Sequence, residues 1–429
     1  MNKDQLIGDD YAVGRVPLTA RSSFFSVALV RIGMTTSLSQ FMLGALLGHS
    51  MTVEQAFLAT FFGSVILEFI SLGLGLAGSR EGLSTSLLAR WCGFGRFGSV
   101  LIGILLTISL VGWFGVQNAV FAHSLDYALG GRLGFTWSAV LAGGALTVLV
   151  AFGFRALSWA AKITVPLFFL VIGWISFGIL QEHTLSHLVT RLPMGAPMTL
   201  GAGATIVAGG YMVGALITPD ISRFCQNGRH VFWMTLISII VGEFIVNGIA
   251  ILVARALNTA DVVTIMTQSA GWIGLLTVIL ATTKNNDACL YSSSLSLANV
   301  VEGVTCRKLS RTKLTIILGV IGTLLSMLGI LERFTGFLIL LGVVFPPIAG
   351  VMLVDYYILR TSRHLLDVTR QRQTLPESTQ LMGWPAVAAC ILGAIGGMTI
   401  ELGIPSFNSL IIACVVYGIL VKVSALLKK

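Results

Sequence analysis

Long apolar runs alternate along the chain with short polar or glycine- and proline-containing breaks. A helix of about 20 apolar residues crosses a hydrocarbon core about 30 Å thick, so runs of this length indicate transmembrane helices. The pattern predicts twelve spans, near residues 24–46, 54–78, 98–125, 134–154, 159–181, 200–222, 231–255, 271–300, 313–331, 334–358, 383–402 and 406–426. The expected fold class is an all-α polytopic membrane protein.

The composition agrees with lipid as the solvent. Of the 429 residues, 55% are hydrophobic and 10% are charged, and the mean hydropathy is +0.90, which excludes an ordinary soluble chain. The net charge of +9 could suggest nucleic acid, but the basic residues are dispersed between apolar runs and form no dense basic face. The six cysteines show neither CxxC spacing nor clustering with histidine, so we expect no resident cofactor, no metal beyond a coupling Na⁺, and no nucleic-acid partner.

Lysine and arginine are distributed unevenly between the breaks. Short loops rich in these residues stay in the cytoplasm, so we expect both termini on the inside of the plasma (cytoplasmic) membrane. In this orientation 21 of the 27 Lys and Arg residues are cytoplasmic, and the external loops carry only Arg132, Arg191, Arg255 and Arg333. Arg31 and Lys284 fall inside spans, and Arg31 is near enough to the cytoplasmic end of its span to reach the interface.

Glycine and hydroxyl residues interrupt two of the spans, at 32–40 in the first and at 201–211 in the sixth. Such residues either allow helices to pack closely or mark breaks, which a membrane tolerates only around a protein cavity. Spans one and six correspond in two five-helix halves, the arrangement of an inverted-repeat carrier. The predicted organisation is a cytoplasmic tail (1–22), a first repeat (23–181), a second inverted repeat (200–358) and two additional helices (383–426).

The eighth span is the most polar, with a run of hydroxyl, amide and charged residues at 281–294. A helix that faced lipid would not carry this run, because each buried charge is costly. Lys284 and Asp287 are three residues apart, so they could pair on one helix face; alternatively, they face a solute pathway. Glu68 and Glu243 are candidate partners for the cations inside the spans.

Trp113 and Gln117 are four residues apart in the third span and share a helix face. An indole offers a flat stacking surface, and an amide offers both a donor and an acceptor. The pair suits a planar heterocycle, although an aromatic side chain in a membrane helix also serves packing.

Five stretches in this order resemble the nucleobase:cation symporter-1 family, and within it the cytosine permeases. They are Glu81 to Arg90, Val111 to Val116, Asp220 to Phe224, Asn286-Asp287 with Leu290-Tyr291, and Pro346-Pro347 through Asp355-Tyr356. The resemblance runs over nearly the whole chain and implies a LeuT-like fold, with two inverted five-helix repeats and a solute site near the midplane.

The resemblance also implies roles for individual residues. Trp113 would stack on one face of the base, and Tyr211, where the cytosine permeases have phenylalanine, on the other. Asn286 would bind the ring edge, and the backbone near Gly209 and Gly210 would supply further polar contacts. Gln117 is more similar to the hydantoin carriers, which leaves the choice of base open.

The cation position departs from the cytosine permeases. The carbonyls of Gly33 and Thr36, with the eighth span around Ala281, would face the coupling cation. Where those permeases have a Thr-Thr pair that supplies hydroxyls to sodium, the ungapped register places Lys284 and Asn285. An ammonium could stand in for Na⁺, because a buried lysine loses its proton readily, so transport would be coupled to Na⁺ or H⁺, or uncoupled.

The sequence therefore predicts a secondary-active importer of a nucleobase, cytosine first, that works by alternating access. A carrier of a hydantoin, purine or hydroxymethylpyrimidine is the alternative within transport. A channel would need a polar lining through the full depth of the membrane, and an enzyme would need a catalytic constellation there. The expected partners are a small heterocycle and membrane lipid.

Overall fold

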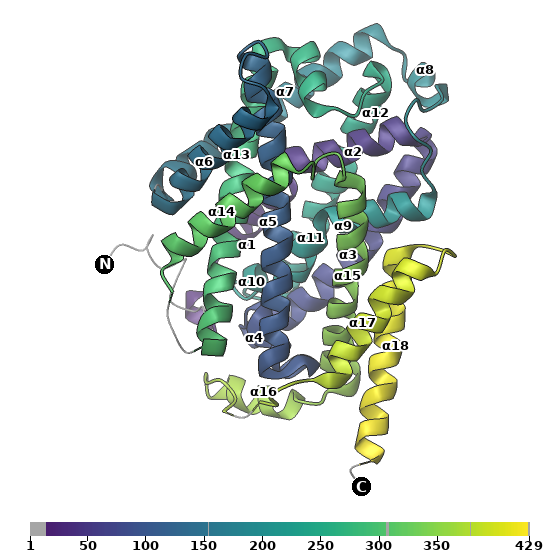
Figure 1. Ribbon diagram of the computed structural model, residues 1–429. Coiled ribbons are helices and arrows are strands. Elements are labelled where there is room, and N and C mark those ends of the chain that lie inside the picture. Colours follow the sequence, from purple (N-terminus) through teal and green to yellow (C-terminus); the bar gives the residue numbers. More distant parts are fainter. Residues whose placement is uncertain (1–13, 153, 306–308, 378, 428–429) are drawn as a thin grey trace.

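The computed structural model describes residues 14–152, 154–305, 309–377 and 379–427. These residues form a helical bundle (Figure 1), and within these ranges the only β-pairing is one isolated bridge between Ser22 and Cys225. The α-helices are α1 (Phe24–Thr35), α2 (Leu38–Ser50), α3 (Val53–Glu81), α4 (Thr85–Ala89), α5 (Gly95–Ala128), α6 (Phe135–Phe152), α7 (Phe154–Glu182), α8 (Leu185–Thr190), α9 (Leu200–Leu216), α10 (Thr218–Ser222), α11 (Gly228–Ile239), α12 (Asn247–Leu257), α13 (Val262–Thr305), α14 (Arg311–Met327), α15 (Phe334–Leu353), α16 (Arg363–Gln371), α17 (Trp384–Thr399) and α18 (Pro405–Leu426).

In the part of the chain that the structure describes, three π-helical segments join some of these helices, and the short 3₁₀ helix η2 (Leu18–Ala20) precedes α1. The π segments are η3 (Arg90–Phe94), η4 (Ile240–Val246) and η5 (Val354–Leu359). In Figure 1 the long α5 runs through the middle of the bundle, α8 and α16 lie at opposite ends, and α17 and α18 form a pair at one side. The middle of α5, residues 111–120, is completely buried.

The first predicted span is broken, as expected from its hydroxyl residues. Thr36 leaves the helix after α1 (φ −84°, ψ 85°), and the extended Ser37 (φ −137°, ψ 158°) begins α2. The Ser37 hydroxyl accepts a hydrogen bond from the backbone N–H of Gln40 at 3.4 Å. The Thr36 hydroxyl donates to the Ile32 carbonyl. Serine and threonine offer the backbone these local alternatives to helix hydrogen bonds, which explains why the break falls here.

The expected break within 201–211 is wrong. The helix α9 is continuous from Leu200 to Leu216, and the interruption comes later, at Ile217, before Pro219 in the first turn of α10. Proline lacks an amide proton and clashes with the preceding helical turn, so it explains the position of this interruption.

The glycines of α9 allow close packing instead. A side-chain carbon added at Gly209 would overlap the Leu338 carbonyl of α15, and one at Gly210 would overlap the Leu43 side chain of α2. The packing alternative that the sequence left open therefore holds for the middle of this helix.

Among the described residues, six helical stretches are long and apolar enough to cross a membrane: Val53–Glu81, Thr85–Ala128, Gly228–Leu257, Val262–Ala298, Phe334–Leu359 and Pro405–Leu426. Five shorter apolar helices accompany them: Phe24–Thr35, Phe135–Ala151, Pro166–Ile179, Leu200–Leu216 and Trp384–Thr399. Large apolar side chains such as Trp137 and Trp174 are about two-thirds exposed, which identifies lipid as the surrounding solvent. The count of twelve crossings stays a prediction.

The start of the eighth predicted span coincides with a kink. Within α13, Gly271 has a positive φ of 55°, a conformation that glycine adopts without steric cost. The residues before it form a separate helical arm that the apolar pattern did not predict, and the predicted span 271–300 begins at the kink.

A Gly-x-x-x-Gly pair holds α2 against α12. A side-chain carbon added at Gly44 would lie 2.7 Å from the Asn247 carbonyl oxygen, and one added at Gly48 would lie 2.6 Å from the Ile251 Cα. At the end of α2, the buried Arg255 of α12 donates to the carbonyl of Met51 at 2.8 Å, which satisfies a helix-terminal acceptor.

The π segment η4 lies against the break in the first span. A side-chain carbon added at Gly242 would be 2.8 Å from the Thr35 Cβ, so the bare backbone of η4 makes room for the end of α1.

Replacing Gly48 with alanine should destabilise the protein by about 1–3 kcal/mol, because α2 and α12 must separate to admit the methyl group. Thermal unfolding of the purified protein in detergent measures the effect. The matched control is Gly418→Ala in α18, where the added carbon meets nothing within 4 Å and helix propensity predicts stabilisation of up to about 1 kcal/mol. Equal melting temperatures for the two variants would contradict the packing assignment.

Candidate functional site

A small cavity lies at the break in the first span. It has a volume of about 10 Å³, which is room for one water or a small cation and far too little for a nucleobase. Its lining comes from α2, α7, α13 and the break: Thr36, Ser37, Leu38, Thr164, Phe168, Ala281, Lys284 and Asn285.

The residues predicted for ion coupling all meet here. The Lys284 ammonium donates to the Gly33 carbonyl at 3.0 Å, while Thr36, Ala281 and Asn285 line the same cavity. The Gly33 carbonyl belongs to the last turn of α1, where a backbone acceptor lacks its helical partner and a cation is favoured. The pair that Lys284 and Asp287 could have formed is absent from the ion pairs of the described residues.

Buried polar atoms without partners gather on the predicted solute residues. Gln117 donates to the Ser39 hydroxyl at 3.1 Å, but its Oε1 atom has no hydrogen-bond partner among the described residues. The same holds for both amide atoms of the fully buried Asn286 and for the Tyr211 hydroxyl. Leaving a buried donor or acceptor unpaired costs about 1–3 kcal/mol. A polar ligand that bonded to these atoms would remove this destabilisation.

The two aromatic side chains predicted to stack on the solute, Trp113 and Tyr211, have different surroundings. Trp113 packs edge-on against Phe334 and Phe337 of α15, with ring centroids 5.9 and 5.5 Å apart. Tyr211 lies under the Arg31 guanidinium, 4.8 Å from its ring centroid. Both rings are buried in the same apolar core, and the stacking roles that the resemblance implies stay predictions.

Arg31 does not reach the membrane interface, so that expectation is wrong. Its side chain is fully buried and donates to the Gly214 carbonyl at 2.8 Å and to the Ser71 hydroxyl at 3.0 Å. These partners come from α9 and α3, and the Tyr211 ring adds a cation–π contact. The sequence could not show that distant spans would supply enough acceptors to hold a buried guanidinium.

Glu68 and Glu243, the candidate partners of the cations inside the spans, bind neutral groups. Glu68 accepts from the Thr235 hydroxyl at 2.7 Å, and Glu243 accepts from the Asn247 amide at 2.9 Å. Among the described residues, neither carboxylate forms an ion pair within 4 Å with Arg31 or Lys284.

Gly209 and Gly210 lie in the continuous helix α9, where the backbone is engaged in helix hydrogen bonding. Their close approach to α15 and α2 gives them a packing function, and their predicted contact with the solute stays a prediction. Phe334, Phe337 and Ser71 could not be predicted at the site from the sequence, since only tertiary packing brings these residues to it.

Three of the five stretches that carried the family resemblance, at 81–90, 220–224 and 346–356, make contacts at one end of the bundle. The Tyr356 hydroxyl donates to the Glu81 carboxylate at 2.8 Å. The Thr85 backbone amide donates to Asp220 at 2.9 Å, and Tyr417 donates to Asp355 at 3.1 Å. These contacts join η5 to α3 and α18, and α4 to α10.

A family model described as a permease for cytosine/purines, uracil, thiamine and allantoin matches residues 19–419. The chain belongs to this permease family. The cytosine permease of Escherichia coli strain K12 is 29% identical to this permease over 414 residues, which cover 96% of this chain and 94% of the relative. The hydantoin permease of Microbacterium maritypicum is 24% identical over 397 residues, which cover 85% and 78%.

Solved structures agree with this assignment. The inward-facing conformation of Mhp1 matches the permease with a TM-score of 0.81 at 19% identity, covering 96% of this chain and 93% of that chain. A closed conformation of Mhp1, a nucleobase-cation-symport-1 family transporter with bromovinylhydantoin bound, matches with a TM-score of 0.70 at 20% identity, covering 96% and 94%. The permease thus has the all-helical, LeuT-like fold of these transporters, and it is an integral membrane transporter of the nucleobase type and not an enzyme.

Replacing Arg31 with glutamine should lower the melting temperature by several degrees. The variant loses hydrogen bonds that are worth roughly 1.5–3 kcal/mol each when the donor is charged. Arg132→Gln, in an exposed loop, is the matched control and should melt like the parent protein. If Arg31→Gln also melted like the parent protein in detergent, the buried network would not contribute to stability.

Proposed function

We propose that this permease imports a planar nucleobase, cytosine first, by alternating access. The observation that carries the proposal is that buried amide atoms of Gln117 and Asn286 have no hydrogen-bond partner among the described residues. Both residues lie close to the break in the first span, because Gln117 bonds to Ser39 and Asn285, the neighbour of Asn286, lines the cavity at the break. The nucleobase edge presents ring nitrogens, carbonyl oxygens and an exocyclic amine, and amides can match both the donors and the acceptors.

The aromatic residues support the same class of solute. Trp113 precedes Gln117 by one helical turn, so an amide and an indole face the same side of α5. Tyr211 brings a second ring and an unpartnered hydroxyl. A flat heterocycle bound between such groups gains stacking as well as hydrogen bonds.

The relatives favour cytosine without excluding a related heterocycle. The E. coli cytosine permease is the more similar in sequence of the two relatives described above, which supports a pyrimidine base. Gln117 is the observation that favours the second candidate, a hydantoin-type ring, because of its similarity to the hydantoin carriers.

For coupling, we infer that the Lys284 ammonium takes the position of a sodium ion. Its hydrogen bond to Gly33 and its place in a cavity of cation size support this. An ammonium there already neutralises the carbonyl end of α1, so a sodium ion would meet electrostatic repulsion. Transport would then be coupled to protons or uncoupled.

We also propose twelve crossings, with spans 23–181 and 200–358 as inverted five-helix repeats and 383–426 as two additional helices. The helical interruptions at Thr36–Ser37 and at Ile217 support corresponding positions for spans one and six. The bias of basic residues supports cytoplasmic termini in the plasma membrane. Of the proposed tail, 1–22, residues 1–13 lie outside the described residues, and Val16 is buried and bonded to Gly82 at 2.9 Å.

A thermal-shift screen of the purified protein against nucleobases and hydantoins tests the solute. A ligand at about 100 times its Kd stabilises the folded state by about 2.7 kcal/mol, and we expect cytosine to give the largest shift. Trp113→Ala should abolish the shift, while Trp137→Ala, which removes an exposed indole, should retain it. An unchanged shift in Trp113→Ala would remove this residue from the site.

Uptake of labelled cytosine into proteoliposomes tests the coupling. Replacing external sodium with choline should leave the parent protein's uptake unchanged within about twofold, because the ammonium occupies the cation position. Lys284→Thr should either acquire sodium dependence or lose uptake, and Lys313→Thr, outside the cavity, should behave like the parent protein. Steep sodium dependence in the parent that persists in Lys284→Thr would overturn the inference.

A further inference from the structure

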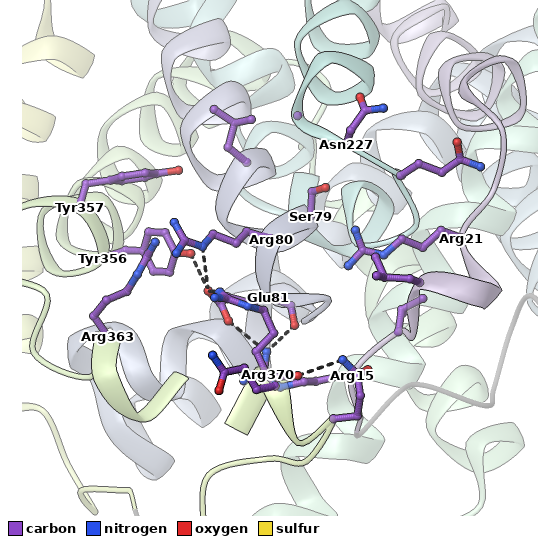
Figure 2. A pocket seen from close by; sticks show the side chains of 17 residues that line it. Arg15, Arg21, Ser79, Arg80, Glu81, Asn227, Tyr356, Tyr357, Arg363 and Arg370 are labelled. Carbon is purple, nitrogen blue, oxygen red and sulfur yellow. Dashed lines mark hydrogen bonds and ion pairs between the residues drawn. The ribbon is translucent and has the colours of Figure 1, made fainter. Parts of the chain in front are cut away.

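A large basic pocket opens at the end of the bundle where three of the family stretches make contacts (Figure 2). Its volume is about 590 Å³, which is typical of a small-molecule site. The segment before α1, the last turns of α3, the start of α11, η5 and α16 form its walls. It lies apart from the residues of the solute and ion sites.

Five guanidinium groups line this pocket, with one carboxylate among them. The carboxylate is Glu81, which accepts from Arg370 at 2.8 Å and from Arg15 at 3.1 Å. The other cations of the lining are Arg21, Arg80 and Arg363. Figure 2 shows Glu81 near the centre, with arginines on several sides.

One further carboxylate, Asp367 of α16, pairs with three of these arginines but does not line the pocket itself. It forms ion pairs with Arg370 at 2.7 Å, with Arg80 at 3.4 Å and with Arg363 at 3.6 Å. Partial burial acts to raise the pKa of Asp367, but the surrounding arginines hold it below its ordinary value. By formal charge, the two carboxylates balance two of the five arginines, so an excess of three positive charges remains.

Two of the guanidiniums are incompletely paired with protein acceptors. Arg80 is half exposed. Arg21 donates to the Cys225 carbonyl at 2.8 Å, but its buried Nε has no partner among the described residues. Guanidinium forks bind phosphate oxygens in pairs, so the pocket has the charge and the donors of a phosphate site.

An exposed apolar stripe on α3 leads toward the pocket. Residues four apart on a helix share a face, and Phe61, Val65 and Phe69 form an exposed apolar stripe on α3. Along the same face, Leu76 lines the pocket and Arg80 stands at its edge. A ligand with a phosphate at one end and hydrocarbon at the other would contact both the basic pocket and the apolar stripe. A soluble phosphate compound would contact the pocket alone.

We propose that this pocket binds the phosphate headgroup of an anionic phospholipid, whose acyl chains lie along the exposed face of α3. Basic pockets at the cytoplasmic ends of membrane helices suit such headgroups. The proposal depends on the membrane position of the bundle and not on the identity of the transported solute. Because the same arginines connect α3, α16 and the segment before α1, the lipid would stabilise this end of the bundle.

Titration of the delipidated protein in detergent with dioleoyl-phosphatidylglycerol or dioleoyl-phosphatidylcholine tests this, with native mass spectrometry to count bound lipid and thermal unfolding to measure stabilisation. We expect phosphatidylglycerol to bind and to raise the melting temperature by several degrees more than phosphatidylcholine. Arg80→Gln combined with Arg363→Gln should weaken phosphatidylglycerol binding at least tenfold. Arg372→Gln, which removes an exposed charge at the end of α16 outside the lining, should bind like the parent protein.

Arg80→Gln alone provides a milder variant, since this side chain is half exposed, and it should weaken binding severalfold. The melting temperature without added lipid shows that each variant is folded. Equal binding of the two lipids, or equal loss in Arg372→Gln and the double variant, would overturn the proposal. Stabilisation by millimolar glycerol 3-phosphate equal to that by phosphatidylglycerol would overturn it in favour of a soluble phosphate ligand.

Discussion

The hydrogen bond from Lys284 to the Gly33 carbonyl satisfies the constraint on which the rest of the site depends. Hydrocarbon offers no partners for backbone groups, so a helix can stop at membrane depth only where the protein supplies donors and acceptors. The first span stops at Thr36, and the eighth span brings a charged donor to the carbonyl that the break exposes. Within the polar run at 281–294, which would be unfavourable in any lipid-facing helix, Ala281, Lys284 and Asn285 meet this junction.

Much of this junction could be predicted from the sequence. A hydroxyl-rich run inside an apolar span predicts a break because serine and threonine bond to the nearby backbone, and the break lies where that run predicts it. The lysine in the eighth span could be placed at the ion position by register, and the structure brings it to Gly33. In these cases the signal was local, or followed from a single alignment register.

The errors came from features whose meaning depends on neighbours distant in the sequence. Glycine in an apolar span serves equally for a break and for close packing, and only the approach of Leu338 shows that Gly209 serves packing. Arg31 stands close enough to a helix end to reach the interface, yet Ser71 and Gly214 hold it inside. The edge-on packing of Phe334 and Phe337 on Trp113 could not be read from the sequence, because it depends on how α15 lies against α5.

The contact between Gly242 and Thr35 places two irregular backbones side by side. The first span lacks a complete set of helical bonds at its break, and η4 has the wider i to i+5 bonding of a π-helix. Neither of the two neighbours therefore offers the other a regular helical backbone to pack against at this level. The break lies next to the lysine, so a change in the angle between α1 and α2 would change the distance between the ammonium and the Gly33 carbonyl. The geometry of the backbone thus links the angle between α1 and α2 to the charge at the ion position.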